Sequence, residues 1–208
     1  MKKLIHIYLS FWLTRRTYLL LTTVVLVFVL SFFIPVLFNA ARLFLLLLGI
    51  MVTLDAWLLY IELRGIEAER IVPDRFSNGD DNKIEITIRN HYTFPVSVKL
   101  IDELPVQFQY RNWERFTVIK ANEESVISYS LRPLQRGEYS FGVINVYITS
   151  PLRLVQRRYV FDQPQSIPTY PSFHQLKKYQ LMGISSRFNE AGNRRLRKLG
   201  NSMEFEQI

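Results

Sequence analysis

The sequence predicts a membrane-anchored all-β protein: a two-helix transmembrane hairpin, then an immunoglobulin-like antiparallel β-sandwich and a basic C-terminal tail. Three observations predict it. Two long apolar runs come first, short segments of alternating apolar and polar residues follow, and the end of the chain is rich in Lys and Arg. The predicted divisions are an N-terminal segment over 1–17, the hairpin over 18–64, the β-domain over 65–172 and a linker over 173–208.

Residues 4–13 are apolar around most of a helix, with a narrow polar stripe that includes Ser10. Lys and Arg flank this segment and Trp12 lies within it. These features predict a cytoplasmic helix in the interfacial region of a membrane, at the level of the lipid headgroups. The alternative is that the same residues extend the first transmembrane helix into the cytoplasm.

Residues 18–38 carry no charge, and residues 43–61 carry one. A hydrocarbon core about 30 Å thick requires roughly 20 helical residues, so both runs are predicted to span a membrane. The four residues between them, 39–42, are expected to form the turn of an antiparallel hairpin. A cleaved signal peptide is disfavoured, because the first apolar run is longer than the 7–15 residues typical of a signal peptide.

The distribution of basic residues predicts the orientation of the hairpin. Lys2, Lys3, Arg15 and Arg16 precede the first span, whereas the predicted turn carries Arg42 alone. Basic flanks stay in the cytoplasm. Both termini and the β-domain are therefore expected in the cytoplasm, with the lipid bilayer as the first partner.

Asp55 is the single ionisable residue within the predicted spans. A carboxylate at the centre of a membrane helix is costly, so it is expected to have a partner. In an antiparallel hairpin Thr22 and Thr23 lie at the same depth, which predicts an intramembrane hydrogen bond from one of these hydroxyls to Asp55. Two interpretations remain open: an acid that clips the hairpin together or extends to the membrane interface, and a proton relay or docking point for another membrane subunit.

Alternation of apolar and polar residues predicts the strands of the β-domain. Seven or eight short strands at intervals of about 8–12 residues are typical of an immunoglobulin-like sandwich. The alternation changes phase next to Gly142, which predicts a β-bulge. The predicted strands cover residues 66–72, 84–89, 96–100, 115–119, 127–131, 139–143, 144–148, 154–161 and 165–169.

Charge argues against a nucleic-acid partner. The whole chain has a net charge of +8, but residues 65–172 contain thirteen basic and thirteen acidic side chains. The excess lies in the flanks, so the β-domain is expected to carry no basic face for nucleic acid.

Candidate catalytic groups do not form a recognisable constellation. The chain has no cysteine and three widely separated histidines, and Asp102 and Glu103 are expected in a solvated turn. We therefore expect no catalytic residues, no metal, no cofactor and no enzymatic activity. The best candidate site is an exposed partner-binding patch of aromatic and arginine residues, although the same residues also fit a core and hairpin. The patch comprises Phe108, Tyr110, Arg111, Trp113, Arg115 and Phe116.

The tail contains a cluster of basic residues, Arg194, Arg195, Arg197 and Lys198. Two roles are open for it. It is either a lipid-headgroup contact, in which each basic residue near an anionic surface contributes about 1 kcal/mol, or a solvated linker.

A series of short motifs carries a family resemblance. They are Asn78-Gly79-Asp80, Arg89-Asn90, Asp102-Glu103-Leu104-Pro105, Arg132-Pro133, Arg136-Gly137-Glu138-Tyr139, Ser150-Pro151-Leu152-Arg153-Leu154, Tyr170-Pro171 and Gly200-Asn201-Ser202-Met203-Glu204-Phe205-Glu206. In this order, after a transmembrane hairpin, they resemble the N-terminal part of the bacterial family called domain of unknown function fifty-eight. The resemblance implies a C-terminal module similar to a von Willebrand factor A domain, a MoxR-type AAA ATPase as partner, and the bacterial cytoplasmic (inner) membrane as location. The sequence stops where that module is expected, which predicts a truncated reading frame or a fragment.

The leading functional prediction is a non-enzymatic adaptor. A membrane-anchored β-sandwich would position the C-terminal module beside the ATPase and other membrane proteins. The alternative is a non-catalytic part of an envelope-associated enzyme system whose active site lies in the missing region.

Overall fold

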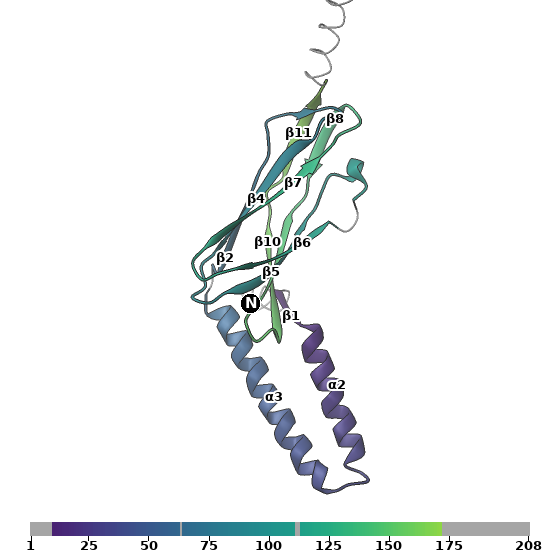
Figure 1. Cartoon of the computed structure of the whole chain (residues 1–208), viewed down its shortest axis with the longest axis vertical. Helices are drawn as coiled ribbons and strands as arrows, with labels where there is room; N and C mark the ends of the chain where they lie inside the picture. The colour runs from purple at the N-terminus through teal and green to yellow at the C-terminus, as the bar shows by residue number, and fades with distance from the viewer. Residues whose placement is uncertain (1–9, 63, 111–112, 172–208) are drawn as a thin grey trace, which may run out of the picture. The chain divides into compact units, whose positions relative to one another are not determined.

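The computed structural model describes residues 10–62, 64–110 and 113–171 (Figure 1). This part of the chain is mostly β-sheet, with two helices near its start. The helices and the strands up to Tyr170 belong to one compact unit. The predicted β-domain is thus present, and the predictions for residues 173–208 lie outside the described residues.

Three residues of the predicted helix, 11–13, form a strand instead, while Ser10 before them is helical. β1 (Phe11–Leu13) pairs antiparallel with β10, and residues 4–9 of the predicted helix lie outside the described residues. Phe11 and Leu13 pack against the core while Trp12 is 52% exposed. In residues 11–13 every second side chain therefore faces the core, as in a strand, and the polar stripe of the predicted helix does not apply to them.

The two helices are α2 (Arg15–Leu30) and α3 (Val36–Ile61), which run in opposite directions and contact each other, and which separate toward the β-domain (Figure 1). The predicted turn at residues 39–42 is wrong, because these residues lie inside α3. The chain turns at residues 31–35 instead, where Pro35 precedes the first residue of α3. Proline disfavours helical backbone in the residue before it and lacks an N–H, so it ends one helix and starts the next.

Among the described residues, α3 is the one helix that is long and apolar enough to cross a membrane, with a mean hydropathy of 2.2. It has 26 residues, or about 39 Å at 1.5 Å per residue. α2 has 16 residues, or about 24 Å.

The remaining strands follow α3 in the order predicted by the alternation. Two elements, β3 and a short 3₁₀ helix at Val106–Phe108, were not predicted. The strands are β2 (Ile66–Ile71), β3 (Phe76–Ser77), β4 (Asn82–Asn90), β5 (Val96–Asp102), β6 (Glu114–Ile119), β7 (Glu124–Leu131), β8 (Gly137–Phe141), β9 (Ile144–Thr149), β10 (Val155–Phe161) and β11 (Gln165–Tyr170).

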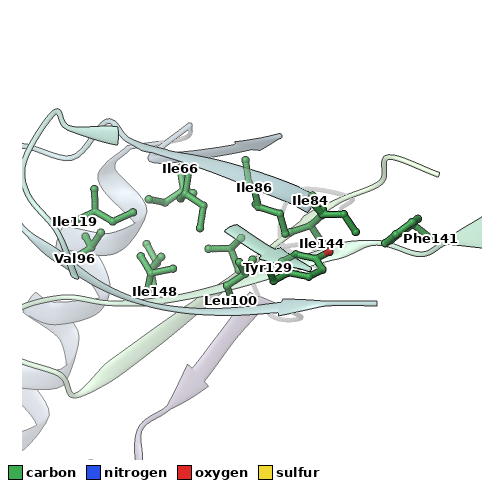
Figure 2. Packing of buried hydrophobic residues seen from close by; sticks show 14 of the residues in the cluster. Ile66, Ile84, Ile86, Val96, Leu100, Ile119, Tyr129, Phe141, Ile144 and Ile148 are labelled. Carbon is green, nitrogen blue, oxygen red and sulfur yellow. The ribbon is translucent and has the colours of Figure 1, made fainter. Parts of the chain in front are cut away.

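The strands form three sheets. A five-stranded sheet has the order β1-β10-β9-β5-β6, and two three-stranded sheets have the orders β2-β4-β7 and β3-β11-β8. All pairings are antiparallel except that of β3 with β11. Ile84 and Ile86 of β4 face Leu100 and Ile148 of the five-stranded sheet across the core (Figure 2), and all four are buried.

The predicted bulge at Gly142 is a change of sheet. β8 ends at Phe141 in one sheet, and β9 begins at Ile144 in another. A Cβ atom on Gly142 would lie 2.5 Å from a carboxylate oxygen of Glu103. The phase change in the sequence therefore marks the crossing between sheets, and the glycine permits the close approach of the Glu103 side chain.

The end of α3 belongs to the core of the β-domain. Leu59 is fully buried in the core cluster, and Val52, Ala56 and Tyr60 pack against it. These residues recur at helical spacing on one face of α3. One face of the last turns of α3 is therefore covered by the β-domain, while Trp57 on another face is 60% exposed.

Candidate functional site

Asp55 lies in α3 but binds the β-domain. Its side chain is fully buried and accepts hydrogen bonds from Ser150 Oγ, from the Leu154 amide at 3.0 Å and from the Val155 amide at 2.7 Å. All three donors belong to the turn between β9 and β10, so the carboxylate replaces water with a complete set of protein donors.

The predicted bond between Asp55 and Thr22 or Thr23 is wrong. Thr22 Oγ1 donates to the Tyr18 carbonyl at 2.9 Å, and Thr23 Oγ1 donates to the Leu19 carbonyl at 3.0 Å. Both hydroxyls are exposed and satisfied within their own helix, as threonines in apolar helices commonly are. Asp55 therefore does not clip the two helices to each other.

The same turn is also bound by the start of α2. Thr17 Oγ1 donates to the Leu154 carbonyl at 2.5 Å, and the Thr14 amide donates to the same carbonyl at 3.0 Å. Thr14 Oγ1 donates to the Arg153 carbonyl at 2.6 Å. The peptide groups of the β9–β10 turn are thus held from one side by α2 and from the other by Asp55 of α3.

One helical turn beyond Asp55, an arginine from β10 binds the end of α3. Arg157 Nη1 donates to the Leu59 carbonyl at 2.5 Å and to the Glu62 carbonyl at 2.8 Å. The guanidinium also lies 4.5 Å from the ring centroids of Tyr60 and Tyr159. The last carbonyls of a helix lack partners within the helix and carry its negative end, so a cation there is favourable.

Tyr92 completes this contact. Its hydroxyl donates to the Leu59 carbonyl at 2.7 Å and lies 2.8 Å from the Tyr159 hydroxyl. Burial raises the pKa of both tyrosines, so they stay neutral. Gly65 makes room for this ring, since a Cβ there would lie 2.2 Å from it. We call the contacts of Asp55 and Arg157 between α3 and the β9–β10 hairpin the helix–sheet joint.

A second buried charged cluster lies inside the β-domain. Arg70 of β2 binds Asp102 of β5, and the Tyr129 hydroxyl of β7 donates to the same carboxylate. Asp102 is thus a buried ion-pair partner and not the solvated turn residue that the sequence predicted. Burial raises the pKa of Asp102, opposed by the charge of Arg70 and the bond from Tyr129.

The Arg70 guanidinium also donates to the Gly142 carbonyl at 3.0 Å and lies 4.8 Å from the ring centroid of Phe141. Arg70 is 2% exposed and Asp102 is 3% exposed, so substrates have no access to either charge. This cluster links the sheets through the point where the chain crosses between them, and its role is structural.

The predicted aromatic and arginine patch is divided in the structure. The ring centroids of Phe108 and Tyr139 are 4.8 Å apart, and those of Trp113 and Tyr129 are 4.4 Å apart, so both predicted residues pack against the β-domain. The Arg115 guanidinium lies 5.5 Å from the Trp113 ring centroid.

Three described members of the patch are exposed. Tyr110 is 63% exposed in the loop before β6 and Phe116 is 70% exposed on β6, where its neighbour Arg115 is exposed as well. Arg111 lies outside the described residues. Partner binding by this set stays a prediction, as does the lipid contact of Arg194, Arg195, Arg197 and Lys198, which also lie outside them.

The chain matches no family model and no curated protein. Solved structures match the β-domain. PapD-like domain 7 of human CEP192 is 15% identical over 52% of this chain and 87% of that domain, with a TM-score of 0.38. A CARDB domain from Pyrococcus furiosus, solved with two metal ions, is 15% identical over 50% of this chain and 87% of that chain, with a TM-score of 0.34.

A β-glucosidase from Listeria innocua is also similar, at 15% identity over 51% of this chain but 16% of the enzyme, with a TM-score of 0.28. TM-scores in this range carry no functional argument, so the metal ions and the glucosidase activity of these proteins are not transferred to this chain. The family resemblance and the ATPase partner remain predictions.

Proposed function

We propose that the protein is a non-enzymatic membrane anchor and adaptor. In this proposal α2 and α3 cross the bacterial cytoplasmic membrane as a hairpin, and the immunoglobulin-like β-domain lies in the cytoplasm. The chain then positions a C-terminal module beside a MoxR-type AAA ATPase. The family resemblance alone supplies the ATPase.

The observation that carries the proposal is the helix–sheet joint. Residues 36–54 of α3 precede Asp55 and span about 28 Å at 1.5 Å per residue, close to a hydrocarbon core of about 30 Å. Asp55 then binds backbone amides of the β-domain, which lies outside the bilayer in the proposal. Thus the acidic residue marks the membrane boundary and fixes the β-domain to the anchor.

A fixed joint suits an adaptor. A flexible linker would let the β-domain sample many orientations, whereas buried hydrogen bonds from two helices to one turn hold it in one. An AAA ATPase that acts on a membrane-bound partner requires a defined point of attachment, which this joint would supply.

The test uses a longer chain that contains the predicted C-terminal module and carries an affinity tag. This chain is expressed together with the predicted partner, a MoxR-type AAA ATPase. The adaptor role predicts that the ATPase co-purifies with the solubilised membrane protein, in the wild type and in the control Thr53→Ala. Thr53 lies on α3 near Asp55 and bonds within its own helix. If the ATPase stays in the unbound fraction with intact wild-type protein, the adaptor role is wrong.

A further inference from the structure

A groove runs between the start of α2 and the outer face of the five-stranded sheet. Its volume is about 540 Å³, within the range of small-molecule sites. Four basic residues line it: Arg15 and Arg16 from α2, Arg153 from the β9–β10 turn, and Lys99 from β5. Its lining contains no acidic residue.

The three arginines form no ion pair with another described residue. Lys99 is bound to Glu114 at 2.6 Å and lies 5.5 Å from the ring centroid of Phe116. The groove therefore carries an uncompensated positive charge from the start of α2 and from the β9–β10 turn, which the bonds of Thr14 and Thr17 hold together. Charge complementarity calls for an anionic occupant.

The floor of the groove follows from the strand register. Lys99 faces Tyr147 on one side and Phe116 on the other, so one cation and two rings form a row across three strands. Phe116 is 70% exposed and Val118, two residues on, is 63% exposed. The occupant must therefore combine a negative charge with an apolar part.

We propose that this groove binds the headgroup of an anionic phospholipid from the cytoplasmic leaflet, which rests on the proposed membrane anchoring. Arg16 lies two residues before the apolar run of α2 that begins at Tyr18, so in an inserted protein the groove opens at the level of the lipid phosphates. Guanidinium groups bind a phosphodiester through paired hydrogen bonds. The exposed Phe116 and Val118 side chains contact the glycerol and upper acyl carbons.

The experiment uses the full chain in a neutral detergent. It is titrated with dioctanoyl phosphatidylglycerol, with dioctanoyl phosphatidylcholine or with inorganic phosphate, and the thermal unfolding midpoint and native mass spectra are recorded. A ligand that binds the folded protein raises the midpoint. We expect a rise and a bound lipid with phosphatidylglycerol, no rise with phosphatidylcholine, and at most a small rise with phosphate.

The variant Arg16→Gln/Arg153→Asn tests the groove itself. Arg153 has a φ of 57°, which asparagine tolerates, so the substitution removes the charge and preserves the turn. Each basic residue near the headgroup accounts for roughly a fivefold change in affinity, so the double variant is expected to bind about 25-fold more weakly. The control Arg136→Gln removes an exposed charge outside the groove and should bind like the wild type.

Three outcomes overturn the proposal: equal binding of both lipids, unchanged binding by the double variant, or equal stabilisation by free phosphate, which would assign the groove to a soluble anion. Failure of the anchoring itself is distinguishable. In that case a high-salt wash would release the protein from the membrane fraction of the expressing cells, whatever lipid the groove binds.

Discussion

Four buried charged residues organise the described chain. Asp55 and Arg157 join α3 to the β9–β10 hairpin, and Arg70 and Asp102 pair inside the β-domain. Each charge has hydrogen-bond partners, as a buried charge requires, although Arg70 Nε has none among the described residues. Removing one partner leaves the other group without water and without a bond, so these positions are expected to be far more sensitive than surface charges.

Asp55→Ala is predicted to lower the free energy of unfolding by about 2–5 kcal/mol, because the Leu154 and Val155 amides lose their acceptor. Thermal or denaturant unfolding in detergent measures this change. Asp55→Asn should cost less, since its carbonyl oxygen can still accept from both amides.

Thr22→Val and Thr23→Val are the controls for Asp55. Their hydroxyls bond within α2, so each substitution is expected to change the free energy by no more than about 0.5 kcal/mol. A Thr22→Val effect equal to that of Asp55→Ala would restore the intramembrane bond that the sequence predicted.

Arg70→Met is predicted to lower the free energy of unfolding by about 3–5 kcal/mol, since Asp102 then keeps a buried charge with Tyr129 as its remaining partner. Arg70→Met/Asp102→Asn should recover part of this loss, because the amide is neutral and still accepts from Tyr129. The exposed pair of Arg89 and Glu124 provides the comparison, and Arg89→Gln should cost at most about 1 kcal/mol. A double variant less stable than Arg70→Met would contradict this account.

Stability is also predicted to fall at alkaline pH. Burial and the Asp102 charge raise the pKa of Tyr129 above its ordinary value of 10.0. Above pH 10 the unfolded chain releases this proton and the folded chain keeps it. The contribution to stability is therefore complete below pH 10 and declines above it, by about 1.4 kcal/mol per pH unit.

Unfolding free energies measured on both sides of pH 10 test the Tyr129 prediction. Tyr129→Phe should show a shallower decline than the wild type, while Tyr110→Phe, at a 63% exposed position, should not. Equal slopes in wild type and Tyr129→Phe would show that Tyr129 titrates normally.

The burial of three of the four charged residues could have been predicted from the alternation of their strands. Arg70, Asp102 and Arg157 each continue the inward phase of a strand whose neighbouring inward residues are apolar, such as Ala68, Leu100 and Val155. A charge on an inward phase predicts a buried pair. Its partner comes from a distant strand, which one sequence does not reveal.

At the scale of elements, most strands follow from alternation because each packs one face on the core. The turn between the helices was predicted at the wrong residues, because Pro35 is a stronger helix-breaking signal than residues 39–42. The bulge was predicted wrongly because a change in the phase of alternation also occurs where the chain crosses between sheets. β1 was not predicted, since its pairing with β10 depends on a contact about 145 residues away in sequence. Contacts of that range are set by tertiary packing.

The joint itself could not be predicted from local patterns. The sequence placed Asp55 within the membrane because apolar residues surround it. In the structure, the face of α3 that carries Asp55 packs against the β-domain. A covered helix end and a lipid-facing helix have the same composition. The two differ only in what the apolar face of the helix contacts, a protein domain in one case and lipid in the other.

Arg157→Gln is predicted to loosen the end of α3. The Leu59 and Glu62 carbonyls lose a charged donor, which is expected to cost about 2–4 kcal/mol in the free energy of unfolding. Hydrogen exchange should become faster in the last turn of α3 than in the wild type. Arg158→Gln is the matched control, because Arg158 is half-buried and binds Asn145 and Tyr147 instead; an equal effect of both variants would contradict the capping role.

At the scale of the whole molecule, the proposed anchoring agrees with how apolar and charged residues are distributed along the chain. The exposed residues of α2 and α3 are predominantly large and apolar, as expected for a surface in contact with lipid, and β-domain residues 65–172 carry no net charge. Basic residues gather at the boundary, around the groove. If the helices insert as proposed, the positive-inside rule predicts that the groove and the β-domain lie together on the cytoplasmic side.

Single cysteines test this topology directly, because the chain has none of its own. Exposed positions are the best sites for the label. The Lys120 side chain is 78% exposed on the β-domain, and Val36 is 81% exposed at the start of α3, whereas Asn90 of β4 is fully buried and unsuitable. A membrane-impermeant maleimide added to intact cells is expected to leave Lys120→Cys unlabelled until the cells are opened, and to label Val36→Cys from outside. Labelling of Lys120→Cys in intact cells would reverse the orientation. Because the β-domain would then face away from the ATP of the cell interior, partnership with an AAA ATPase would fail with it, while the bonds of Asp55 to the β9–β10 turn would be unaffected.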